Sequence, residues 1–139
     1  MTISTSRLYS GPADLQSMLD LLIAVRPAER ITDFPSAVDL RELLALPVVQ
    51  DNTRLWFDAD DRLVGFAFVD HYQNLRFEFD SQAISPGIDA EFVAWGVQCI
   101  RRAMQAQGEA LTLDASCSAD DTARIALLER HGFIQQALR

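Results

Sequence analysis

The pattern of hydrophobic and polar positions is clearest in the middle of the chain, where a strand, a break and a long helix are expected in succession. Hydrophobic and charged residues alternate strictly over residues 75–80, which predicts a strand with two unlike faces. Ser85-Pro86-Gly87 then interrupts the pattern, because proline donates no N–H and glycine accepts turn dihedrals. Between Gly87 and Gly108, apolar residues recur at helical spacing: Phe92, Trp95, Cys99, Ile100 and Ala103. A strand that leads into a helix N-terminus is a common phosphate site, so we expect function to depend on residues 86–94.

The same reasoning divides the rest of the chain into alternating helices and strands. The other predicted strands cover residues 7–9, 54–57, 63–69 and 110–113, with a last strand from residue 133. The other predicted helices cover residues 12–25, residues 36 up to Pro47 with a capping box, and residues 123–131. The order β-α-α-β-β-β-α-β-α-β predicts one α/β domain over residues 1–139. Hairpin strands should be antiparallel and helix-linked strands parallel, giving a mixed sheet with helices on both faces.

Composition and charge limit the function. The net charge is −8, and all 12 cationic residues are arginines. An acidic chain without a basic cluster is not expected to bind nucleic acid or anionic membranes, and the absence of lysine excludes Schiff-base chemistry. No apolar run is long enough for a bilayer span, and residues 1–6 lack a signal-peptide pattern, so we expect a cytoplasmic protein. The two cysteines do not form a disulfide framework.

Three local motifs carry a resemblance to a known family. They are Arg62-Leu63-Val64-Gly65-Phe66-Ala67, Ala83-Ile84-Ser85-Pro86 and Leu127-Leu128-Glu129-Arg130-His131-Gly132-Phe133. In their order and spacing, these motifs resemble those of the GCN5-related N-acetyltransferase (GNAT) superfamily, and the resemblance covers nearly the whole chain. The resemblance implies that acetyl-CoA lies between the fourth and fifth strands, with a small-molecule amine as acceptor. The positions that match the family's cofactor-binding residues are Ala83, Ile84, Gly87, Ile88, Asp89, Ala90 and Asp121.

The chain departs from the family's pyrophosphate loop at several of these positions. Asp89 lies where the family has Arg or Gln, Phe92 takes a small-residue position, and Glu91 lies between. Two carboxylates in the first helical turn would repel a diphosphate and could cap the free N–H groups themselves, while Phe92 would obstruct backbone approach. A diverged but working loop and an ordinary acid-capped helix both remain open, so acetyl-CoA binding is expected to be weak or lost.

The expected catalytic groups are also sparse. Leu128 matches the position of the tyrosine that protonates the leaving thiolate in many family members, and a leucine cannot donate a proton. Glu78 could act as the base that deprotonates the amine, or it could belong to a solvated or ion-paired face of the strand. His71 and His131 are too isolated for a metal site, so no metal is expected. Ser116-Cys117-Ser118 has no neighbouring base, which makes a nucleophile there a weak hypothesis.

These observations lead to two functional hypotheses. The first is an accessory, non-catalytic acetyltransferase-like domain, and the second is an active acetyl-CoA-dependent N-acetyltransferase with an atypical loop. The family has one more strand after the sixth, so the fifth strand is expected to leave an exposed edge. A second GNAT domain in tandem, or another copy in a dimer or other homo-oligomer, could cover it. Residues 26–35, which would shape the acceptor pocket, have mixed charge and are expected to form a mobile surface segment.

Overall fold

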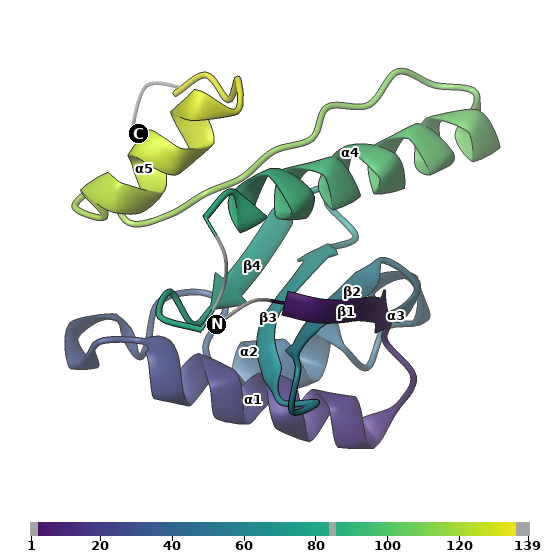
Figure 1. The fold of residues 1–139 in the computed structure, drawn as a ribbon. Helices are drawn as coiled ribbons and strands as arrows, with labels where there is room; N and C mark the ends of the chain where they lie inside the picture. Colours follow the sequence, from purple (N-terminus) through teal and green to yellow (C-terminus); the bar gives the residue numbers. More distant parts are fainter. Residues whose placement is uncertain (1–2, 84–85, 136–139) are drawn as a thin grey trace.

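The computed structural model describes residues 3–83 and 86–135, and its centre is an antiparallel sheet in the order β1-β2-β3-β4 (Figure 1). The strands are β1 (Ile3–Leu8), β2 (Thr53–Asp58), β3 (Leu63–Val69) and β4 (Leu75–Phe79). Carboxylates organise both hairpin turns: Asp58 accepts the amides of Asp60 and Arg62, and Asp70 those of Tyr72 and Asn74. The predicted hairpin and the alternating strand after it are confirmed. The first strand begins earlier than predicted and ends at Leu8.

Helices cover both faces of this sheet, as the sequence predicts. They are α1 (Pro12–Val25), the 3-10 turn η1 (Ala28–Arg30), α2 (Ala37–Leu43), α3 (Pro47–Asp51), α4 (Ile88–Gln107) and α5 (Thr122–Arg130). In Figure 1, α1 and α2 lie on one face, α4 lies on the other, and α5 lies beyond the first turns of α4. The Ser36–Asp39 capping box is present at α2. Pro47 was expected only to end this helix, but it also begins α3, because proline is well tolerated in a first helical turn.

The most apolar strand divides the core into two clusters. Every residue of β3 is buried, as expected for a strand covered on both sides. Phe66 and Phe68 pack toward Met18 and the rest of the α1–α2 layer, while Ala67 packs in the cluster that contains the buried residues of α4. No helix in the described residues has the length and apolarity needed to cross a membrane.

The prediction of a fifth strand at residues 110–113 is wrong. Residues 110–113 are not paired, and within the described residues a single parallel bridge, Asn74–Asp114, joins this segment to the sheet. The sheet is therefore antiparallel rather than mixed, although the segment runs in the predicted direction beside β4. Leu111 and Leu113 pack against the α4 core cluster without forming a ladder. Residues 133–135 form no strand, and the remainder of the predicted last strand lies outside the described residues.

The start of α1 carries a buried ion pair that predicts acid sensitivity. Asp14, only 7% exposed, accepts two hydrogen bonds of 2.8 Å from Arg7 and others from the amide and hydroxyl of Ser10. These bonds, chiefly those from Arg7, lower the pKa of Asp14 from 3.8 to about 2. A lowered folded-state pKa stabilises the fold above the unfolded value and loses that contribution as the pH falls.

We therefore expect Asp14→Asn to lower the free energy of unfolding by about 1–2 kcal/mol at neutral pH, allowing for screening around the half-exposed Arg7. The difference from the wild type should shrink between about pH 4 and pH 2, where the wild-type carboxyl becomes protonated. Urea unfolding at a series of pH values measures this. Asp20→Asn, on an exposed position of the same helix, is the control, and a difference independent of pH would contradict the assignment.

Candidate functional site

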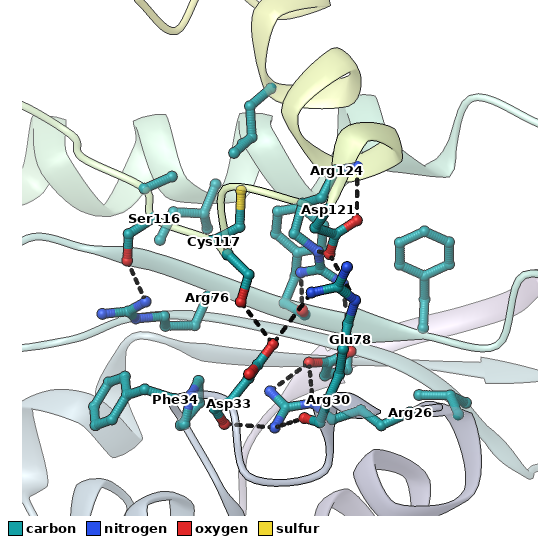
Figure 2. A pocket seen from close by; sticks show the side chains of 18 of the residues that line it. Arg26, Arg30, Asp33, Phe34, Arg76, Glu78, Ser116, Cys117, Asp121 and Arg124 are labelled. Carbon is teal, nitrogen blue, oxygen red and sulfur yellow. Dashed lines mark hydrogen bonds and ion pairs between the residues drawn. The ribbon is translucent and has the colours of Figure 1, made fainter. Parts of the chain in front are cut away.

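A cavity of about 480 Å³ opens where β4 and residues 115–118 separate (Figure 2). The two segments are joined at Asn74–Asp114, and both line the cavity beyond that bridge. The connection between α1 and α2, including Arg26, Arg30 and Phe34, forms the opposite wall. The parting of strands that the GNAT resemblance implies is therefore present, between β4 and an extended segment rather than between two ladder-forming strands.

The edge of β4 faces this cavity with its backbone. In the β3–β4 register, even-numbered residues of β4 bond to β3, so Leu75, Phe77 and Phe79 direct their amides and carbonyls the other way. The Leu75 amide donates to Asp114, and the Phe77 carbonyl accepts from Arg124 at 2.8 Å. Among the described residues, no backbone partner is found for the amides of Phe77 and Phe79. These two N–H groups could donate to a bound carbonyl.

Glu78 lies at this edge and is fixed by two arginines. Its Oε2 accepts from Nη2 of Arg26 at 2.8 Å and from Nε of Arg26 at 3.1 Å, and its Oε1 lies 3.4 Å from Nη2 of Arg124. The side chains of Glu78 and Arg26 are only 10% and 7% exposed. The geometry is that of the ion-paired alternative, since both carboxylate oxygens already accept hydrogen bonds. A role as catalytic base would require one of these contacts to open.

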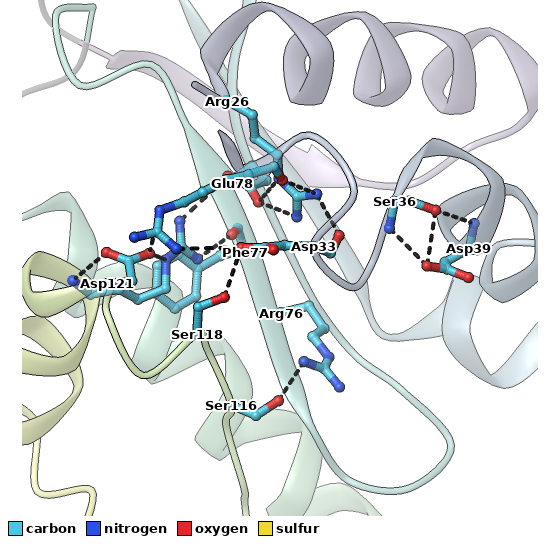
Figure 3. A network of polar contacts seen from close by, with 12 residues as sticks. Arg26, Asp33, Ser36, Asp39, Arg76, Phe77, Glu78, Ser116, Ser118 and Asp121 are labelled. Atoms are coloured by element: carbon cyan, nitrogen blue, oxygen red, sulfur yellow. Dashed lines mark hydrogen bonds and ion pairs between the residues drawn. The ribbon is translucent and has the colours of Figure 1, made fainter. Parts of the chain in front are cut away.

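Residues 26–35 are anchored to the sheet, which corrects the expectation of a mobile surface segment. Arg26 donates to the Asp33 carbonyl at 2.7 Å as well as to Glu78, and the Ser118 hydroxyl donates to the Asp33 carboxylate at 2.8 Å (Figure 3). Arg30 pairs with Asp120 across the cavity mouth. Local sequence patterns do not predict these contacts, because the partners are distant in the chain. The usable signal is only the high density of arginine in residues 26–30.

Asp121, one of the expected cofactor contacts, has a structural role. It is the N-cap of α5, and its side chain accepts from the amide of Arg124 at 3.2 Å. It also lies 3.9 Å from Nε of Arg30 and lines the cavity. Its position is therefore compatible with ligand contact, but its hydrogen bonds serve the helix.

The start of α4 differs from the acid-capped helix expected. Gly87 is the N-cap, with a left-handed φ of 88°; within residues 3–83 and 86–135 no side chain caps the first turn, and the Ala90 amide donates to the Gly87 carbonyl at 3.1 Å. Asp89 instead contacts Nε2 of His131 and Nη2 of Arg130 at the end of α5, and the bond to His131 is the main reason that its pKa is lowered. Glu91 accepts from the indole N–H of Trp56 at 3.1 Å. The Asp89 side chain therefore links α4 to α5.

The remaining predicted positions divide between the core and the surface. Phe92 is fully buried beside Trp56, so it fills the core instead of obstructing the loop from outside. Of the other expected cofactor-binding positions, Gly87 and Ala90 are exposed, Ala83 and Ile88 are buried, and Ile84 lies outside the described residues.

Other chemistry in the cavity is limited. Within the described residues, no group of His, Cys, Asp or Glu side chains is arranged to hold a metal ion. Cys117 lines the cavity, but partial burial and nearby Asp121 raise the pKa of its thiol, which disfavours the nucleophilic thiolate. Leu128, at the position of the family's tyrosine, is buried and lines the cavity with a hydrocarbon side chain.

Solved structures share this fold. A GCN5-related N-acetyltransferase from Sphaerobacter thermophilus is 23% identical with a TM-score of 0.63, over 92% of this chain and 42% of that one. An acetyltransferase of the GNAT family from Listeria monocytogenes is 11% identical with a TM-score of 0.60, over 97% and 88%. Spermidine N-acetyltransferase from Vibrio cholerae, in complex with CoA and spermine, is 13% identical with a TM-score of 0.55, over 96% and 82%.

The likeness lies in the fold and is weak in the sequence. No protein-family model matches the chain, and no curated protein matches it either. The chain spans less than half the length of the Sphaerobacter thermophilus protein. These findings show that the described residues adopt the GNAT fold.

Proposed function

We propose that this domain, which has the GNAT fold, is an accessory domain of an N-acetyltransferase and does not itself transfer acetyl groups. It would bind a small ligand in the cavity beside β4. The observation that carries the proposal is the contact of Asp89 with Arg130 and His131. If the first turn of α4 is the diphosphate site, as the GNAT resemblance implies, a coenzyme would meet this carboxylate and the end of α5 there.

The positions expected to perform the chemistry support the same proposal. Glu78 is ion-paired with Arg26 and Arg124, which orient its carboxylate toward these two arginines rather than toward a bound amine. Leu128 offers no proton for a leaving thiolate. Asp89, although paired with Arg130, puts a carboxylate beside the first turn of α4, where a diphosphate needs free amides and no like charge. These residues fit acetyl-CoA poorly.

An active acetyl-CoA-dependent N-acetyltransferase acting on a small amine is the second candidate, and two observations favour it. Within the described residues, the first turn of α4 has no side-chain cap, and the amides of Phe77 and Phe79 face the cavity. In such an enzyme the amides could receive phosphate and thioester oxygens, and Glu78 would act as base after release from Arg124.

A partner for this domain is part of the proposal. In the part of the chain that the structure describes, residues 110–113, the predicted fifth strand, have no ladder partner beyond the Asn74–Asp114 bridge next to them, and unpaired backbone favours association. A second GNAT domain or another copy of the chain could cover it. The greater length of the Sphaerobacter thermophilus protein is compatible with the tandem arrangement.

A cytoplasmic location for this domain also remains a prediction.

Thermal unfolding with acetyl-CoA separates the two candidates. We expect no shift for the wild type at millimolar cofactor. Asp89→Arg should gain a measurable shift, because it replaces a repelling carboxylate by a guanidinium at the position of the family's Arg or Gln. A ligand at 100 times its Kd stabilises a fold by about 2.7 kcal/mol, which sets the size of a clear result.

Glu109→Arg, on an exposed residue beyond α4, is the matched charge reversal. Acetyl-CoA should not change the thermal unfolding temperature of this variant. A wild-type shift of the stated size would favour the active enzyme, and an equal gain in both variants would show that net charge alone attracts the coenzyme.

A further inference from the structure

One arginine in the cavity has hydrogen-bonding capacity that the described residues leave unused. Arg76 extends from β4 between Ser116 and Phe34, and its side chain is 11% exposed (Figure 2). Nη1 donates to the Ser116 hydroxyl at 2.8 Å, and the guanidinium carbon lies 4.8 Å from the centre of the Phe34 ring. Nε is buried without a hydrogen-bond partner in the described residues. Of its five N–H donors, one on Nη1 is used and the Nε–H is shielded from solvent, so three N–H groups, on Nη1 and Nη2, have no partner in the described residues.

The nearest carboxylate does not complete this site. Oδ2 of Asp70 lies 3.7 Å from Nε of Arg76, beyond hydrogen-bond range. Oδ1 of Asp70 is already used by the turn amides of Tyr72 and Asn74. Burial lowers the pKa of Arg76, and the nearby Asp70 carboxylate acts in the opposite direction.

The other three arginines of the cavity are committed to protein partners. Arg26 uses Nε, Nη1 and Nη2 on Glu78 and the Asp33 carbonyl. Arg124 bonds to the Phe77 carbonyl and pairs with Glu78, and Arg30 pairs with carboxylates on both sides of the cavity mouth. Arg76 is thus the member of this set, within the described residues, that can accept an external anion at little cost to the protein's own contacts.

The cavity selects the class of anion. Four arginines and three carboxylates line it, and Asp70 and Asp120 pair with Arg76 and Arg30 from outside the lining, so the site has no excess positive charge and suits a monoanion better than a phosphate dianion. A planar guanidinium offers parallel N–H donors that match a carboxylate. Much of the remaining wall is apolar, formed by residues such as Phe34, Leu75 and Phe77. A monocarboxylate with an apolar body satisfies both surfaces.

We infer that Arg76 binds the carboxylate of a small, partly apolar ligand in the cavity beside β4. The inference names the ligand class of the cleft and in that respect rests on the proposed function. It holds equally for an accessory ligand and for the amine acceptor of an active enzyme, which would then carry a carboxylate. Acetyl-CoA has no part in the contact, so this inference is tested without the coenzyme.

The test uses the full 139-residue chain, phenylacetate as the probe and phenylacetamide as its neutral counterpart. Titration followed by NMR should move the Nε–H signal of Arg76 in the wild type. Phenylacetate should bind at least about tenfold more tightly than phenylacetamide, because the amide cannot form the charge-assisted pair. Arg76→Gln should lose at least about tenfold in affinity for phenylacetate.

Arg101→Gln, on an exposed position of α4, removes the same charge and should bind phenylacetate like the wild type. If Arg76→Gln does not fold, the wild-type Nε–H signal and the comparison with phenylacetamide decide the matter. Equal binding of the two probes, unchanged affinity in a folded Arg76→Gln, or an unmoved Arg76 signal would overturn the inference. None of these outcomes bears on acetyl-CoA, whose binding is measured separately.

Discussion

Replacing Glu78 by Gln is expected to destabilise the fold by about 3–5 kcal/mol, because it removes the counter-charge of a buried arginine. Arg26 is 7% exposed, and its Nε and Nη2 both donate to Oε2 of Glu78. The amide of glutamine would preserve shape and one acceptor, but it would leave the Arg26 charge uncompensated. Chemical denaturation of the two proteins at neutral pH and moderate salt measures the difference in free energy of unfolding.

Two comparisons make this prediction specific to the buried pair. Glu29→Gln, on an exposed neighbour of Arg26, should change stability by less than about 0.5 kcal/mol. The double variant Arg26→Met/Glu78→Met removes both charges and should be less destabilised than Glu78→Gln, since no unpaired charge stays buried. A loss below about 1 kcal/mol in Glu78→Gln would contradict the ion pair and restore Glu78 as a candidate base.

This pair shows what local sequence patterns can predict. The alternation over residues 75–80 correctly places Glu78 on the opposite face of β4 from Phe77, because side-chain direction has a period of two along a strand. The pattern contains nothing about Arg26, which is 52 residues away in the chain. Which residue pairs with Glu78 depends on where the end of α1 packs against the sheet, and this packing is a property of the tertiary structure.

The predicted strand at residues 110–113 failed for a related reason. Leu111 and Leu113 alternate with polar residues as a strand would, and both pack against the core. A strand also needs a partner edge, however, and Arg124 of α5 occupies the Phe77 carbonyl that a longer ladder would use. Periodicity reports which side chains are buried, and it does not report how the backbone is paired.

The start of α4 shows a competition between local and distant partners. Acidic residues in a first turn commonly cap their own helix, which made capping by Asp89 the natural expectation. In the structure, the side chains of Arg130 and His131 at the end of α5 provide the partners instead. The departure of this chain from the GNAT motif was visible in the sequence, but its structural meaning, a tie between two helices, was not.

Among the side chains at the start of α4, Phe92 is expected to contribute most to the stability of the fold. Phe92→Ala should lower the free energy of unfolding by about 3–5 kcal/mol, since the ring is fully buried and its removal leaves a cavity. The ring centres of Trp56, Phe77 and Phe79 lie 4.8, 5.5 and 5.6 Å away. Urea unfolding measures the loss, and Ile23→Ala, an exposed position of α1, should change stability by less than about 0.5 kcal/mol.

Gly65 provides an internal check on this packing. A Cβ atom at Gly65 would lie 3.0 Å from Cζ of Phe92, so Gly65→Ala in the wild type should cost about 1–3 kcal/mol through overpacking. After Phe92→Ala the same methyl group would enter vacated space, and the double variant should be more stable than the sum of the single losses predicts. Additive losses would mean that the ring of Phe92 is not held against β3. The side chain would then be free to swing toward the loop at Gly87, where the GNAT resemblance first placed it as an obstacle to the coenzyme.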